Sequence, residues 1–236
     1  MERLEELIGK AMGRSGYATR LVRVKVPLNL EEAVSIYTAI GTNLCGHEYV
    51  IDRFNRFAIE NTLKWLHCDE SMLCNMPEGK EHMKGDITKG LYYAGPTGTG
   101  KSLLTEIINV YSTICDIGYR YGNDTAKLTF LHERSDAIVD AYVNDGTLKR
   151  YKDSRLLCIQ DLGSEATEAL YMGTRVNVLR TILEARGDMR NIITIVTSNL
   201  PMQNKRIVER YGERVQSRLH SMFNYFAIGG SDYRTK

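Results

Sequence analysis

The chain has 236 residues, which is enough for one well-buried core with a small addition. Hydrophobic residues make up 43% of it and charged residues 25%, as in ordinary soluble globular proteins, and the net charge of +2 permits nucleic-acid binding through a local patch without arguing for it. No apolar run reaches the ~18 residues of a membrane span, and the first residues carry three Glu and no apolar stretch, so neither a membrane anchor nor a secretory signal is expected.

The part before residue 89 is expected to be small and mostly helical. Periodicity predicts a helix, a strand and two further helices at residues 2–13, 19–26, 29–42 and 53–67. Residues 68–88 are polar and contain Pro and Gly, which predicts a loop. We therefore expect two parts, residues 1–85 and 86–236.

From residue 89 short β-rich runs alternate with helical ones. The strands are expected near residues 90–95, 127–131, 156–160, 192–199 and 225–229. The helices are expected near residues 100–118, 132–143 and 173–187, with two short ones near 203–221. This alternation predicts an α/β fold with a parallel sheet flanked by helices.

Residues 95–102, GPTGTGKS, match the pattern G-x-x-x-x-G-K-[ST] between an expected strand and an expected helix. Such glycines let successive N–H groups face one anion, and the helix start adds a positive dipole end. Lys101 is expected to reach the β- and γ-phosphates of ATP, and Ser102 to ligate Mg²⁺. The predicted ATP-binding residues are Gly95, Pro96, Thr97, Gly98, Thr99, Gly100, Lys101, Ser102 and Leu103.

Asp161 follows the strand expected at residues 156–160, where the carboxyl ends of parallel strands gather. If Asp161 is the magnesium ligand, the catalytic base must come from elsewhere, for example from Glu165. If Asp161 aligns the attacking water, Gln160 takes the metal position and brings no charge to it. A purely structural turn at Asp161 is the third alternative.

Further polar residues follow the later elements. Asn199 can hold the attacking water or touch the γ-phosphate, or it can simply cap a turn. Arg214 and Arg218 are four residues apart and share one helix face, which is either solvated or presented to a neighbouring subunit's γ-phosphate. Arg234 could bind the phosphates of its own subunit.

Five segments, GPTGTGKS, LLCIQDLGSE, TIVTSNL, RYGERVQSRL and SDYR, together resemble the DnaC/DnaI/IstB group of AAA+ ATPases, which are helicase loaders and transposition helper proteins. The resemblance covers about residues 86–236 and implies a P-loop NTPase (AAA+) core without a C-terminal helical lid. It implies that Lys101 binds phosphates, that Asp161 aligns the attacking water and that Asn199 is the first sensor residue. It also implies that Arg218, or Arg214 as its substitute, is the arginine finger presented to a neighbouring subunit's γ-phosphate. Arg234 would be the second sensor residue. Gln160 stands where the family has its magnesium-orienting Asp, so slow hydrolysis is expected.

The resemblance also suggests partners. Loaders of this family bind single-stranded DNA inside a spiral of subunits, and residues 148–155 offer Lys149, Arg150 and Lys152 for phosphates and Tyr151 for base stacking, unless they form only a solvated loop. Residues 1–85 correspond to the part that docks the replicative helicase, although packing on the core explains their helices equally well. The five scattered cysteines form no C-x₂₋₄-C pair, so we expect free thiols in a reducing cytoplasm and no zinc.

The leading hypothesis is an oligomeric ATPase that uses ATP and Mg²⁺ to load a replicative helicase during DNA replication. An IstB-like transposition helper and a poorly hydrolysing ATP-dependent DNA-binding scaffold are the alternatives. A small-molecule kinase also uses a P-loop, but Arg214 and Arg218 follow the TSN strand in the order of the loaders.

Overall fold

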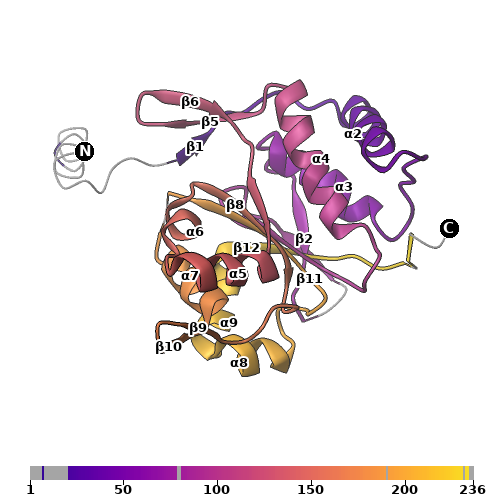
Figure 1. Ribbon diagram of the computed structural model, residues 1–236. Helices are drawn as coiled ribbons and strands as arrows, with labels where there is room; N and C mark the ends of the chain where they lie inside the picture. Colours follow the sequence, from indigo (N-terminus) through magenta and orange to yellow (C-terminus); the bar gives the residue numbers. More distant parts are fainter. Residues whose placement is uncertain (1–6, 8–20, 79–80, 190, 231, 234–236) are drawn as a thin grey trace.

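A seven-stranded sheet, in the order β3-β2-β12-β4-β11-β8-β7, runs through the molecule (Figure 1). The computed structural model describes Leu7 and residues 21–78, 81–189, 191–230 and 232–233. Strands β12, β4, β11, β8 and β7 are parallel to one another, while β2 and β3 add an antiparallel edge. The strands of this sheet are β2 (Leu73–Asn75), β3 (His82–Lys84), β4 (Gly90–Ala94), β7 (Leu131–Arg134), β8 (Leu156–Leu162), β11 (Ile193–Ser198) and β12 (Phe223–Ala227).

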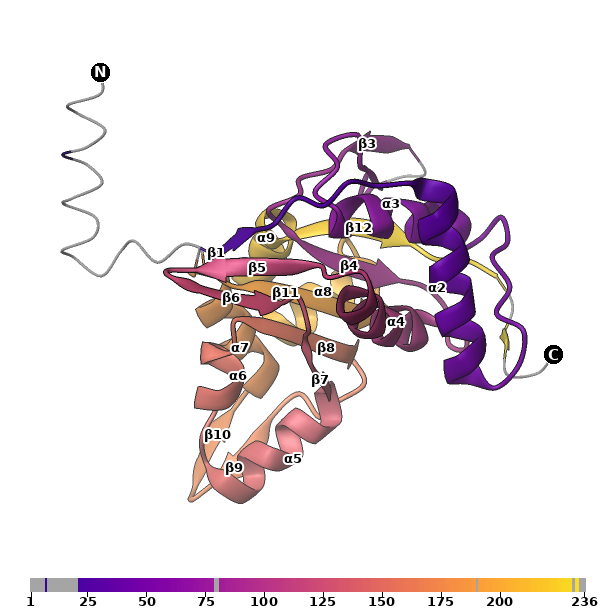
Figure 2. The ribbon, with the colours of Figure 1, turned by 90° about the horizontal axis from the view of Figure 1, so that it is seen from above.

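Helices cover both faces of the sheet (Figures 1 and 2). They are α2 (Leu30–Cys45), α3 (Arg56–Leu66) and α4 (Lys101–Ile114) on one face, and α5 (Ser135–Asp145), α6 (Lys149–Asp153), α7 (Val178–Gly187), α8 (Lys205–Tyr211) and α9 (Glu213–Met222) on the other. Strand β4 shows how the two cores are divided, because successive side chains of a strand point to opposite faces. Leu91 and Tyr93 join the first core, whereas Tyr92 and Ala94 join the second. All five residues of β4 are buried, as expected for a strand covered on both sides.

The predicted parallel sheet with flanking helices is therefore confirmed, as are the helices expected at 29–42 and 53–67. Three strand pairs were not predicted. Strands β2 and β3 lie inside the expected loop 68–88. A hairpin of β5 (Gly118–Tyr121) and β6 (Asp124–Lys127) pairs with β1 (Leu21–Arg23), which lies within the strand expected at 19–26. Strand β9 (Ala169–Tyr171) pairs with β10 (Thr174–Val176). The expected loop 148–155 contains α6, and the helix expected at 2–13 lies outside the described residues apart from Leu7.

The described residues before 85 share their core with the rest of the chain. Helix α2 packs on α4, and β2 extends the main sheet through the pairing of Asn75 with Tyr225. The described residues before 85 therefore pack against the rest of the chain, and both the division at residue 85 and the partner-binding role of residues 1–85 stay predictions. None of the described helices combines the length and the apolar character that crossing a membrane requires.

The topology places several loops at one edge. Ser198 at the end of β11 lies level with Ala94 of β4 and with Leu162 of β8. Because these strands are parallel, the segments that follow them meet at the carboxyl edge of the sheet, where open α/β sheets bind ligands. Helix α4 starts at this same edge (Figure 2).

Candidate nucleotide-binding site

The segment GPTGTGKS forms the loop between β4 and α4 that its pattern predicts. Gly98 and Gly100 have φ angles of +80° and +78°, a region that side chains other than glycine rarely adopt. A Cβ atom on Gly95 would lie 2.1 Å from the carbonyl oxygen of Ile228, so the loop also needs glycine for close approach. The first backbone N–H groups of α4, which have no partner within the helix, begin here and can meet an anion.

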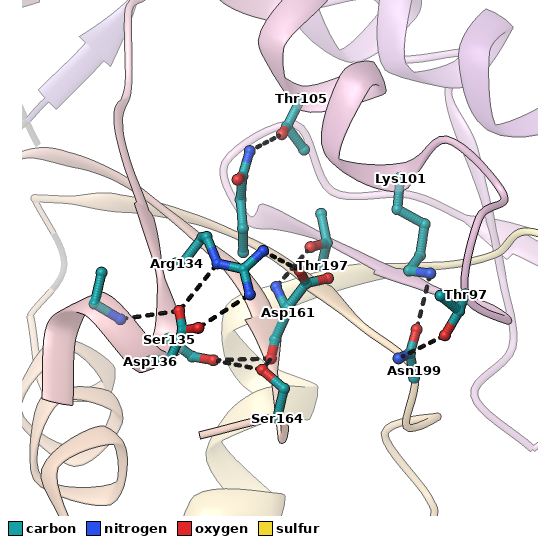
Figure 3. Close-up of polar contacts among 12 residues, drawn as sticks. Thr97, Lys101, Thr105, Arg134, Ser135, Asp136, Asp161, Ser164, Thr197 and Asn199 are labelled. Carbon is teal, nitrogen blue, oxygen red and sulfur yellow. Dashed lines mark hydrogen bonds and ion pairs between the residues drawn. The ribbon is translucent and has the colours of Figure 1, made fainter. Parts of the chain in front are cut away.

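Lys101 at the end of this loop contacts Asn199, which follows β11 (Figure 3). The Lys101 ammonium donates to the carbonyl oxygens of Gly95 and Pro96, at 2.8 and 2.7 Å, and to Asn199 Oδ1 at 3.0 Å. Asn199 Nδ2 donates in turn to Thr97 Oγ1 at 3.3 Å. Asn199 therefore links the end of β11 to the phosphate loop, next to the site expected for the γ-phosphate.

Asp161 lies at the end of β8 with its side chain 29% exposed. Its φ of +55° is unusual for a residue with a side chain. Hydrogen bonds fix its backbone: Thr197 Oγ1 accepts from the Asp161 N–H at 3.0 Å, and the hydroxyls of Ser135 and Ser164 both donate to the Asp161 carbonyl at 2.8 Å. Strained backbone held by its surroundings is common at functional sites, and it directs this carboxylate into the cavity beside the phosphate loop.

Gln160 points away from that cavity. Its side-chain amide donates to Thr105 Oγ1 of α4 at 3.3 Å, and only 9% of the residue is exposed. Ser102 and Asp161 line the cavity together, whereas Gln160 is not among its lining residues. Within the described part of the chain, no three His, Cys, Asp or Glu residues group as a metal site. One hydroxyl and one carboxylate fit a Mg²⁺ ion that takes most of its ligands from phosphates and water.

Arg134, the last residue of β7, reaches the same carboxylate (Figure 3). Its guanidinium lies 3.0 Å from Asp136 Oδ2 and 3.4 Å from Asp161 Oδ2, with 56% of the side chain exposed. Hydrogen bonding to Asp136 raises the pKa of Arg134 and lowers the pKa of Asp136. Sequence reasoning missed Arg134, although its place at the end of the strand next to β8 is a signal that could have identified it.

Glu165 is not available as the catalytic base. Its side chain is 1% exposed and accepts hydrogen bonds from the Tyr211 hydroxyl at 2.5 Å, from Arg210 at 3.1 Å and from the Gly163 N–H at 2.8 Å. These contacts tie the turn after β8 to α8. The alternative in which Glu165 activates water is therefore wrong for this structure.

The cavity has a volume of about 570 Å³, within the range of small-molecule sites. One wall is the phosphate loop with Arg134, Asp161 and Asn199. The opposite wall was not predicted: it comes from the segment between α2 and α3, including Tyr49, Val50 and Asp52, together with Tyr233 near the end of the chain. Apart from SDYR, which contains Tyr233, no motif marks this wall in the sequence, because it forms only when distant segments pack together.

The two arginines of α9 differ in their surroundings. Arg218 donates to the carbonyl of Glu184 and pairs with Asp188 Oδ1 at 2.5 Å, and 14% of its side chain is exposed. Arg214 is exposed to solvent. Of these two arginines, Arg214 is therefore the one whose side chain is open to solvent. Arg234 lies outside the described residues.

The predicted DNA-contacting residues lie on α6, on the helical face that carries α5 and α7. Lys149 and Arg150 are exposed and Lys152 is partly exposed, with Arg150 paired to Glu133 at 3.2 Å. Tyr151 is only 4% exposed and belongs to the core, so its ring is not open to a stacking base. Contact with DNA at α6 would therefore rest on charge rather than on stacking.

Comparison with known proteins supports the fold. No protein-family model and no curated protein matches the chain. The solved structure of a candidate primosome component from Streptococcus pyogenes serotype M3 is similar, with 19% sequence identity and a TM-score of 0.52 over 79% of this chain and 85% of that one. The structure of the DnaC helicase loader has 18% identity and a TM-score of 0.48 over 76% of this chain and 93% of that one, too low a score to add to the argument. At such identities the likeness concerns the fold alone: the chain shares with the candidate primosome component an α/β fold, which here is a mostly parallel sheet flanked by helices.

Proposed function

We propose that this chain is an AAA+ ATPase that binds ATP and Mg²⁺ at the carboxyl edge of its sheet and acts in DNA replication as a loader of a replicative helicase. The observation that carries the proposal is the meeting of the phosphate loop, Lys101, Asp161 and Asn199 around one cavity. The motif order and the fold shared with a candidate primosome component favour replication over other uses of a P-loop.

The chemistry is phosphoryl transfer to water. Lys101 neutralises the β- and γ-phosphates, and the Ser102 hydroxyl and the Asp161 carboxylate hold the Mg²⁺ that ATP brings. With Gln160 turned to Thr105, Asp161 has to serve both the metal and the attacking water, so hydrolysis is slow. Asn199 orients the attacking water or the γ-phosphate.

Self-association completes the site. A trans-acting arginine contributes about 10³- to 10⁵-fold in rate, and it must leave its own subunit to do so. Exposed Arg214 meets this condition, whereas Arg218 is held by Glu184 and Asp188. We therefore assign the finger to Arg214, which reverses the preference drawn from the motif alone.

The proposed nucleic-acid partner is single-stranded DNA. Its phosphates would be contacted by Lys149, Arg150 and Lys152 of α6. Such contacts release counterions, so affinity should fall steeply as salt rises. The proposed helicase partner rests on the family resemblance and on the shared fold.

Phosphate release from ATP, with and without a single-stranded oligonucleotide, tests the proposal. We expect slow basal turnover that DNA stimulates, and a loss of about 10²-fold in Asn199→Ala, the usual cost of removing one preorganised polar group. Asn144→Ala, at an exposed position near the end of α5, is the matched control and should match the native protein. Turnover that needs a small phosphoryl acceptor and ignores DNA would indicate a kinase instead.

A second candidate function is supported by one observation: the Gln160 side chain points to Thr105 and does not line the cavity. In this alternative the protein is a scaffold that binds ATP, oligomerises and grips DNA with little hydrolysis. ATP-dependent DNA binding without measurable phosphate release would favour it over the loader ATPase.

A further inference from the structure

The last described residues of the chain cross the phosphate loop as a strap, which we define as residues 228–230 and 232–233. The Ile228 N–H donates to the Ala94 carbonyl at 2.7 Å, and the Tyr233 N–H donates to the Gly98 carbonyl at 3.0 Å. Side chains press on the loop as well: a Cβ atom on Gly98 would lie 2.0 Å from the Asp232 carboxyl carbon. The strap is thus in direct contact with the first and fourth residues of the P-loop motif.

The Tyr233 contact bears on anion binding. A peptide unit is planar and trans, so its carbonyl and its N–H point in opposite directions. Because the Gly98 carbonyl points to Tyr233, the Thr99 N–H of the same unit points the other way, away from the strap. Loop N–H groups that face one point are what holds a phosphate. Fixing this carbonyl therefore orients a donor for the nucleotide.

The Tyr233 side chain continues the connection to the far wall of the cavity. Its hydroxyl donates to Asp52 Oδ2 at 2.6 Å. Asp52 Oδ1 accepts from the Phe54 N–H at 2.8 Å, and the Asp52 carbonyl accepts from the Arg56 N–H at the start of α3. Both Tyr233 and Asp52 line the cavity.

Two glycines allow the strap to take this path. Gly230 has a φ of +102°, and a Cβ atom on Gly229 would lie 3.1 Å from Phe54 Cδ1. The strap therefore packs closely against the segment that leads into α3. One chain of contacts runs from the phosphate loop through Tyr233 and Asp52 to the amino end of α3.

We propose that Tyr233 and Asp52 are positioning residues for the nucleotide, which hold the Gly98–Thr99 peptide in its phosphate-binding orientation and couple nucleotide binding to the segment before α3. This inference rests on the proposed nucleotide-binding function. Because the Thr99 N–H serves a phosphate that ATP and ADP share, both nucleotides should depend on the Tyr233–Asp52 contact to the same degree.

The test is titration of the full chain with fluorescent ATP and ADP, combined with hydrogen exchange of residues 49–56. Tyr233→Phe removes only the hydroxyl, and it should weaken both nucleotides about 3- to 10-fold, the range for one lost hydrogen bond. In the native protein, nucleotide binding should slow the hydrogen exchange of residues 49–56, and in Tyr233→Phe this protection should disappear. Asp52→Asn should stay within about 2-fold of the native affinity, because its amide can still bond to both Phe54 N–H and the Tyr233 hydroxyl. Tyr171→Phe, on the β9–β10 hairpin outside the cavity lining, is the matched control.

Asp52→Ala and the double variant Tyr233→Phe/Asp52→Ala give an independent check. If the two residues act through one contact, the double variant is no weaker than Asp52→Ala alone. Additive losses, or a Tyr233→Phe protein with native affinity and native protection, would overturn the inference while leaving the proposed function intact. A native protein that binds neither nucleotide would overturn the proposed function itself.

Discussion

Replacing Arg218 and Arg214 one at a time should separate structural support from function on the same helix. For Arg218→Ala we expect the free energy of unfolding to fall by about 2 kcal/mol. The Arg218 guanidinium donates to the Glu184 carbonyl, and a hydrogen bond from a charged donor is worth about 1.5–3 kcal/mol. The ion pair with Asp188 adds less than about 1 kcal/mol, because Asp188 is 64% exposed and the pair is screened.

Arg214→Ala should change stability by no more than about 0.5 kcal/mol, since the described residues offer the Arg214 side chain no hydrogen bond or ion pair. It should retain nucleotide affinity but lose DNA-stimulated turnover by about 10³-fold or more. The change in stability is measured by urea unfolding, followed by the fluorescence of Trp65, which is the single tryptophan and is fully buried. The change in turnover is measured by phosphate release.

An Arg218→Ala protein as stable as the native one, but without turnover, would refute this reasoning and return the finger role to Arg218. Stability loss in Arg214→Ala equal to that in Arg218→Ala would also contradict it. For both variants turnover has to be normalised to the folded fraction, so that a loss of folded protein is not taken for a loss of catalytic rate.

Three further predictions concern the interior and the cavity. Gln160→Asp should leave the Mg²⁺ concentration that gives half-maximal turnover unchanged, because the side chain at position 160 faces Thr105 and not the cavity that Ser102 and Asp161 line; a lower half-maximal concentration would mean that residue 160 reaches the metal. Arg134→Ala should raise basal turnover by freeing the Asp161 carboxylate, and a fall in turnover would instead give Arg134 a role on the nucleotide. Arg186→Met should lower the free energy of unfolding in urea by about 3–5 kcal/mol, because each buried acceptor left without a donor costs about 1–3 kcal/mol. The buried Arg186 guanidinium donates to Thr194 Oγ1 and to the carbonyls of Tyr151, Ser154 and Ile193. A loss below about 1 kcal/mol would mean that these acceptors find other donors.

The sheet and the phosphate loop could be predicted because their signals are local. Strands covered on both faces read as short apolar runs between helical segments, as β4, β8 and β11 do. The loop pattern carries its own geometry, since Gly98 and Gly100 need positive φ angles. Asp161 and Asn199 followed from the rule that parallel strands end at one edge.

What the sequence concealed depends on long-range packing. Strand β2 is three residues long and pairs with β12 about 150 positions later, so it has no periodicity of its own. Strands β6 and β10 consist largely of exposed residues, so their segments look like loops in the sequence. Tyr151 was taken for a surface aromatic, although its ring completes the core beneath α6. Tyr233 and Asp52 meet from positions 181 apart, which no local pattern reveals.

Binding of ATP in the cavity at the carboxyl edge can be measured by titrating fluorescent ATP in the presence of Mg²⁺ into the native protein and into Lys101→Ala. We expect saturable binding by the native protein and a loss of at least about 10²-fold in affinity for Lys101→Ala, because two or more charge-assisted contacts to phosphate are removed. Equal affinity of the two proteins, or no binding by the native protein, would contradict ATP binding in this cavity.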